Sequence, residues 1–308
     1  MLTALFIPLL IPWFQLTPWE IPFPFIHTLK LQPFGLLVAM GILLGSRVAE
    51  LRAEKTGVPR QVMADFLVYT TVIGLVSCYF LNAAFYDPEN IVAIFKDPTQ
   101  LFKKYLGLSS FGGFIGGAAA AAWFSHKKKM SLIVLGDIWC FAFPFAWVFG
   151  RMGCFTVHDH PGLVSNFFLA VDNYNGEGLP RHDLGLYEVI WSLGAIALFS
   201  YLGRKPRKRG FFLALLPLTY APVRFFLDYL RETPEHGGDV RYWGLTPGQY
   251  CSVLFFLVGV ALAVYVARSP EPALMLDGAP LPEPAPTPSS ASQKGAAKTA
   301  SARKQRSR

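Results

Sequence analysis

Ionisable side chains crowd into a short stretch at the end of a long apolar run, FGRMGCFTVHDHPG, and recur in PRHDLGLYE further along the chain. The ionisable residues singled out there are Arg151, His158, Asp159, His160, His182 and Asp183. Histidine changes charge near neutral pH, and an aspartate can orient its ring. One of the three histidines could therefore act as a general base toward a thiol or a hydroxyl, oriented by Asp159 or Asp183.

The same residues allow two other interpretations. Histidine and aspartate are also zinc ligands, so a metal-dependent membrane enzyme that uses His158, His160 and His182 is an alternative. A solvated loop with polar turn residues is the second. The general-base interpretation requires neither a metal nor another cofactor.

Further charges lie within or beside apolar stretches, where an unpaired charge costs several kcal/mol. The charged candidates for substrate binding are Asp137, Arg151, Glu188, Arg224, Asp228 and Arg231. Asp137 and Glu188 could equally pair with arginines and fix a helix bundle. Three arginines near one membrane surface exceed what the local carboxylates need. Their planar forks of donors suit a phosphate, and a phospholipid headgroup is the expected anion.

Membrane-spanning helices must position these side chains. The chain has 308 residues, of which 53% are hydrophobic and 16% charged, and its mean hydropathy is +0.37. A spanning helix needs roughly 20 mainly apolar residues. Such stretches occur at about 32–50, 64–84, 109–125, 132–150, 185–203, 210–230 and 247–267. The sequence therefore predicts an all-α polytopic membrane protein with about seven transmembrane helices.

The distribution of lysine and arginine predicts the orientation, because short cytoplasmic loops are rich in both. Basic residues concentrate in 47–60, in 127–129, in 203–210 and at the C-terminal end. We therefore expect the N-terminus outside, the C-terminus in the cytoplasm and the histidine-rich loop at the outer face. The net charge of +8 then reflects topology and attraction to membrane lipids. Nucleic acid is not an expected partner, since the cations lie in separate loops.

Both ends of the chain differ from the middle. Residues 1–30 are apolar but contain five prolines, which block a regular helix, and predict an interfacial segment on the outer leaflet. A cleaved signal peptide is the competing interpretation. Residues 31–268 are the expected transmembrane catalytic domain. Residues 269–308 are rich in Pro, Ala and Ser with a basic end, which predicts a disordered cytoplasmic tail.

Six motifs spread over residues 31–252 resemble those of the prolipoprotein diacylglyceryl transferase family of bacterial inner membranes, in the family's order. They are QPFGLLVAMG, SSFGGFIGG, GDIWCFAFPFAWVFGRMGCF, LGLYE, YAPVRFFLDYLRETP and LTPGQYCS. The resemblance implies that Arg151 and Arg224 contact the lipid headgroup and its phosphate. It also places Tyr220, Asp228 and Arg231 in the family's Tyr-x-x-Arg-Phe segment and the acid and arginine that follow it.

The activity implied by this resemblance is a transfer of diacylglycerol from phosphatidylglycerol to the lipobox cysteine thiol of a preprolipoprotein. A thiolate would attack the glycerol carbon that bears the phosphate ester and release glycerol phosphate. The expected site is a lipid-accessible cavity that opens to the outer leaflet of the inner membrane. Because a free thiol has a pKa of about 8.5, a nearby base would assist the attack.

Three positions depart from the family pattern. Phe111 replaces the usual histidine before two glycines, Phe34 replaces a tyrosine of the first motif, and Cys154 stands where asparagine is often found. We therefore hypothesise that His158, His160 or His182 has taken over as the base. A non-catalytic phospholipid-binding relative that retains Arg151 and Arg224 is the other alternative. A transporter is disfavoured, since the hydropathy pattern shows no internal repeat.

Overall fold

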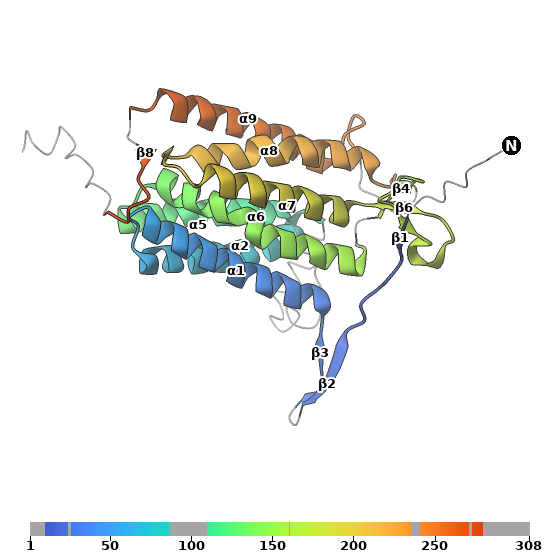
Figure 1. The fold of residues 1–308 in the computed structure, drawn as a ribbon. Coiled ribbons are helices and arrows are strands. Elements are labelled where there is room, and N and C mark those ends of the chain that lie inside the picture. Colours follow the sequence, from blue (N-terminus) through green and yellow to red (C-terminus); the bar gives the residue numbers. More distant parts are fainter. Residues whose placement is uncertain are drawn as a thin grey trace, which may run out of the picture.

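In the part of the chain that the structure describes, seven long helices pack side by side into one bundle (Figure 1). The computed structural model describes residues 10–23, 26–86, 110–159, 161–233, 235, 241–270 and 273–279. The long helices in that part of the chain are α1 (Pro33–Lys55), α2 (Arg60–Tyr86), α5 (Ser110–Lys128), α6 (Leu132–Val157), α7 (Leu184–Leu202), α8 (Phe211–Leu227) and α9 (Pro247–Arg268). Each overlaps one of the seven apolar stretches expected from the sequence.

Six of these helices are long and apolar enough to cross a bilayer, and α5 is not among the six. Large apolar side chains face outward from the bundle, for example Leu43 on α1, Leu193 on α7 and Leu254 on α9. Such a surface is unfavourable in water but suits lipid tails, where helices associate by close packing and hydrogen bonds. The prediction of an all-α polytopic membrane protein is confirmed.

Helix α5 packs against α2 through its glycine-rich start. A Cβ atom added to Gly112 would lie 2.5 Å from the backbone oxygen of Ser77, and one added to Gly116 would overlap the Ser77 side chain. Small residues at this spacing let two helix backbones approach closely. The glycines of SSFGGFIGG are therefore explained by helix packing.

Short strands gather at both ends of the bundle. At one end, β1 (Ile11–Pro12), β5 (Val171–Asp172), β6 (Arg181–Asp183) and β4 (Pro161–Val164) form a sheet in that order. Only the β1–β5 pair is parallel. We call residues 161–183 the head. A hairpin of β2 (Trp19–Phe23) and β3 (Ile26–Leu31) projects from the start of α1 (Figure 1).

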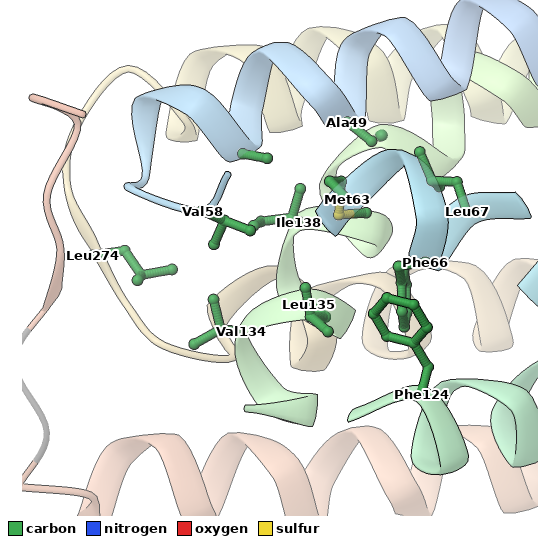
Figure 2. Close-up of a cluster of buried hydrophobic side chains, with 12 residues drawn as sticks. Ala49, Val58, Met63, Phe66, Leu67, Phe124, Val134, Leu135, Ile138 and Leu274 are labelled. Atoms are coloured by element: carbon green, nitrogen blue, oxygen red, sulfur yellow. The ribbon is translucent and has the colours of Figure 1, made fainter. Parts of the chain in front are cut away.

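The opposite end of the bundle carries the basic loops and the antiparallel pair of β7 (Arg207–Lys208) and β8 (Ala273–Leu274). A core cluster of apolar side chains from α1, α2, α5 and α6 lies near this end (Figure 2). Leu274 belongs to that cluster and is 3% exposed, while the Gly278 amide donates to the Lys55 carbonyl. Packed structure thus extends beyond residue 269, where the disordered tail was expected to begin, because β8 gains a strand partner and buries Leu274. Residues 280–308 lie outside the described part.

The N-terminal segment crosses the head before it reaches the hairpin. The Ile11 amide donates to the Ala170 carbonyl over 2.9 Å, and the Leu16 amide donates to the Thr156 carbonyl over 3.4 Å. Its location on the outer leaflet stays a prediction, as does the orientation of the termini.

Candidate active site

The ends of α6, α7 and α8 nearest the head bring together an arginine, a glutamate and two aromatic side chains. Arg151 Nε on α6 lies 2.9 Å from Glu188 Oε2 on α7. The same carboxylate oxygen accepts hydrogen bonds from Trp147 Nε1 at 3.3 Å and from Tyr220 Oη at 2.7 Å. Glu188 is 1% exposed. Within the apolar bundle, this ion pair and its two additional donors satisfy a charge that would otherwise be costly.

Local sequence places each of these side chains. Trp147 precedes Arg151 by one helical turn on α6, and the guanidinium carbon lies 4.6 Å from the centre of the indole ring. Asp183 is the N-cap of α7, where its carboxylate accepts from the Leu186 amide over 3.0 Å. That cap starts the helix and so fixes Glu188 in its second turn.

A second arginine–carboxylate pair lies near the end of α8. Arg224 Nη1 pairs with Asp228 Oδ1, four residues later in η2 (Asp228–Leu230). Asp228 is fully buried and its other oxygen accepts from the Thr246 hydroxyl. Thr246 and Gln249 form a capping box at the start of α9. A Cβ atom on Gly248 would lie 2.5 Å from Asp228 Oδ2, so glycine there permits α9 to approach the pair.

The two pairs differ from the expectation that arginines outnumber nearby carboxylates. Arg151 is matched by Glu188 and Arg224 by Asp228, so the four side chains together carry no net charge. A guanidinium has five N–H donors, however, and one carboxylate does not use them all. The arginine side chains also remain 12% and 17% exposed, whereas their acidic partners are almost wholly buried. Both guanidiniums can therefore donate further hydrogen bonds to an anion.

Arg231, the third predicted arginine, lies just after η2. Its backbone forms a β-bridge with Gly162 of the head, and its carbonyl accepts from Arg241 Nη2 at 3.4 Å. The structure thus gives its backbone a role in joining the end of α8 to the head, while its contact with substrate stays a prediction.

His158 is held from several sides at the end of α6. Its Nδ1 lies 2.7 Å from Asp183 Oδ2, its Nε2 lies 2.6 Å from the Phe14 carbonyl oxygen, and the Trp13 ring stacks on it at 4.1 Å. Its own carbonyl accepts from the Tyr174 hydroxyl. Both ring nitrogens therefore already face an acceptor. With its side chain 1% exposed, His158 is placed to tie the N-terminal segment to α6 and α7.

His182 has different surroundings. Its Nδ1 lies 2.6 Å from the Tyr187 hydroxyl oxygen on α7, and burial lowers the pKa of its half-buried ring. Successive side chains of a strand point to opposite faces, so His182 on β6 faces away from Asp183 and its partner His158. The structure therefore separates two of the three predicted zinc ligands. In the part of the chain that it describes, no three His, Cys, Asp or Glu side chains gather as a metal site would require. His160 lies outside the described residues.

Asp137 lies elsewhere in the bundle. It precedes Arg151 by 14 residues on α6, a rise of about 21 Å along the helix. Its Oδ1 accepts from the backbone amides of Phe212 and Leu213 at 2.6 and 3.2 Å, and so caps the start of α8. The carboxylate serves a helix terminus, as expected of a residue that fixes the bundle, and the structure does not bring it to the arginine pairs.

Two of the three departures from the family pattern can be placed. The Phe34 ring packs on Gly153, where an added Cβ atom would lie 2.9 Å from its Cδ2, so this ring stands close to the Arg-x-Gly turn. Cys154 is buried, with its sulfur 3.8 Å from Arg151 Nη1. The side chain of Phe111 lies outside the described part.

Several residues of the site were not identified from the sequence. Trp147 and Thr246 contact the buried carboxylates, and Trp13 and Tyr174 hold His158. The i,i+4 spacing of Trp147 and Arg151 and the Thr-x-x-Gln capping box were readable signals. The contacts of Trp13 and Tyr174 depend on tertiary structure and had no local signal.

A bundle of membrane-spanning helices that carries two arginine–carboxylate pairs with buried acids at one end defines a polytopic membrane protein with a polar site among its helix termini. The family model of prolipoprotein diacylglyceryl transferase matches residues 21–265. The chain belongs to this family of transferases.

Individual relatives are similar in sequence to this protein along most of its chain. A protein from Chromohalobacter salexigens is 30% identical over 247 residues, 78% of this chain and 90% of its own length. One from Bordetella bronchiseptica is 29% identical and covers 80% and 95%, and one from Staphylococcus aureus is 28% identical and covers 83% and 92%. Each is named phosphatidylglycerol–prolipoprotein diacylglyceryl transferase.

Proposed function

We propose that this protein transfers a diacylglyceryl group from phosphatidylglycerol to the lipobox cysteine thiol of preprolipoproteins. The observation that carries the proposal is the pair of partly exposed guanidiniums, Arg151 and Arg224, each oriented by a buried carboxylate within a chain of this family. In the reaction, a carbon–sulfur bond forms at the glycerol carbon while its bond to the phosphate oxygen breaks. Glycerol phosphate leaves, and the thiol proton passes to a base.

The arginines would bind the phosphate and stabilise its charge as the ester bond breaks. Charge-assisted bonds from a guanidinium to a phosphate are short and often bidentate. In a site with little water, donors that are already oriented lower the barrier most effectively. Glu188 and Asp228 would act as positioning residues, because each orients a guanidinium while leaving some of its N–H donors available for the phosphate.

His182 is the best supported base among the described histidines. Burial lowers its pKa, so the ring is neutral at neutral pH and has a nitrogen that can accept a proton. Tyr187 contacts this ring and directly precedes Glu188 on α7, which links the histidine to the arginine site. His158 is a weaker candidate, because both of its nitrogens already face acceptors.

The proposed setting is the bacterial inner membrane, with the arginine site toward the outer leaflet. The support is the location of the basic loops at the end of the bundle opposite the head, since cytoplasmic loops are rich in lysine and arginine. A lipobox segment and its phospholipid donor would then meet on the outer side.

The test is lipidation by the purified protein in detergent, with phosphatidylglycerol and a lipobox peptide. We expect the peptide cysteine to gain the mass of one diacylglyceryl group, with and without a chelator. Arg151→Lys should lower kcat/KM by about a hundredfold or more, since lysine lacks the bidentate fork. Arg47→Lys is the matched control, because Arg47 is half exposed at the other end of the bundle.

Each alternative has its own result in this assay. A chelator that abolishes transfer would favour the metal-dependent enzyme. Binding of phosphatidylglycerol that requires Arg151 and Arg224, without any mass gain on the peptide, would favour the non-catalytic relative and contradict the proposal.

A further inference from the structure

A cavity of about 240 Å³ lies between the head, the N-terminal segment and the end of α6, outside the arginine site. Its walls come from the N-terminal segment, the end of α6, the loop between β5 and β6, and the chain after η2. The residues that give it its chemistry are Trp13, Tyr174, Glu177, Arg181 and Glu232. It is smaller than the roughly 300 Å³ at which sites for small molecules begin, and it suits a single side chain.

The charges of the cavity do not cancel. Arg181 Nε donates to Glu177 Oε2 over 3.1 Å, and Arg181 Nη1 pairs with Glu232 Oε2. Among the described residues that line the cavity, one cation and two carboxylates carry a net charge of −1. His158 also lines the cavity and is paired with Asp183. The cavity therefore attracts a positive group.

Aromatic rings beside the carboxylates point to the same ligand. Tryptophan is the aromatic residue that attracts cations most strongly. Trp13 and Tyr174 both line the cavity. The exposed amides of Gln15 and Asn175 add donors and acceptors suited to a peptide backbone. This combination fits a lysine or arginine side chain carried by an extended peptide.

The distance between the cavity and the arginine site indicates which peptide the cavity binds. His158 follows Arg151 by seven residues, a rise of about 10 Å on the helix. An extended chain advances about 3.3 Å per residue, so about three residues span that distance. We propose that the cavity receives a cationic side chain of the lipoprotein substrate, at about the third residue after the lipobox cysteine. This rests on the proposed function, which places that cysteine beside Arg151.

The experiment compares lipobox peptides with Lys, Gln or Glu at the third position after the cysteine, and one with Lys at the eighth. Affinity is measured by fluorescence anisotropy with labelled peptides at low salt, and transfer by the mass gain on cysteine. We expect the third-position Lys peptide to bind about fivefold more tightly than the Gln peptide, as for a partly exposed ion pair, and the Glu peptide to bind more weakly still. The eighth-position Lys peptide should bind like the Gln peptide.

Removing the carboxylates should change this preference in steps. Glu177→Gln brings the net charge of the cavity to zero and should abolish the preference for Lys, and Glu177→Gln with Glu232→Gln leaves Arg181 unmatched and should reverse it. Asp172→Asn is the matched control, since Asp172 is an exposed carboxylate of the head outside the cavity. It should keep the wild-type order.

The two proposals fail in different ways. Transfer to all peptides with equal affinities for Lys and Glu would overturn the cationic site and leave the transferase intact. A Lys preference that responds to Glu177, without transfer to any peptide, would support the site and contradict the transferase.

Discussion

Replacing His158 tests whether this histidine is a structural tie or a catalytic base. The His158 ring contacts Asp183 Oδ2 at 2.7 Å and the Phe14 carbonyl at 2.6 Å, and the shorter reach of the side chain in His158→Gln leaves at most one of these contacts. A hydrogen bond to a charged group contributes about 1.5–3 kcal/mol, and leaving a buried acceptor without its partner costs about 1–3 kcal/mol, or more when the acceptor is charged. We take about 3 kcal/mol as the loss, because glutamine can retain one contact.

The loss should appear where the N-terminal segment joins the head. The amides of Ile11 and Leu16 donate to backbone carbonyls there, and their exchange with solvent reports opening of the segment. A loss of about 3 kcal/mol corresponds to roughly a hundredfold faster exchange, since each 1.4 kcal/mol is a factor of ten. Hydrogen exchange read by mass spectrometry in detergent measures this directly, and transfer activity is measured on the same sample.

His182→Gln is the comparison variant. We expect it to lower transfer at neutral pH with unchanged exchange at Ile11 and Leu16, the opposite of His158→Gln. Slow exchange at both amides in His158→Gln, together with a hundredfold loss of kcat, would identify His158 as the base and refute the reasoning.

Three further predictions concern packing and pH. Gly116→Leu should lower the free energy of unfolding by about 1–3 kcal/mol, because the leucine side chain would overlap α2. Gly194→Leu is the control and should be nearly neutral, because nothing lies within 4 Å of a Cβ atom added there. Thermal unfolding in detergent measures both variants. His182, whose pKa is lowered by burial from 6.5, binds its proton less readily when folded, so its contribution to stability should be lost as pH falls below about 6.5. Urea titrations of wild type and His182→Gln at several pH values measure that difference, and an identical pH dependence would contradict it. Leu274→Ala should lower the free energy of unfolding by about 2–5 kcal/mol, because Leu274 is buried in the core cluster. Met275→Ala is its control, because Met275 is 57% exposed. Equal unfolding temperatures of the two variants would contradict the packing of Leu274.

The sequence was sufficient for the helices and for part of the site. The apolar stretches located the seven long helices that the structure describes, and for six of them the reason is that a bilayer demands long apolar stretches whatever their packing. Arg224 and Asp228 lie four residues apart, a spacing that brings side chains together on a helix, and the structure pairs them. Arg151 and Glu188 lie on different helices, and no local rule identified them as partners.

The histidines show why the rest could not be predicted. His158 is followed by Asp159, and His182 by Asp183, which suggested two local pairs. The structure pairs His158 with Asp183 instead, because neighbouring residues of a strand face opposite ways. Likewise the role of Asp137 as a cap for α8 depends on where a distant helix begins.

The strand β8 has a consequence for the order in which the protein is completed. Its partners, β7 and the turn after α1, are synthesised long before it, and Leu274 fills a space that α1, α2 and α6 leave between them. Among the described helices, α9 is the last and ends at Arg268, so one residue of the core is synthesised only after these helices. Leu274 is buried among residues that are synthesised earlier, so the bundle reaches its full stability only after residue 274 has been added.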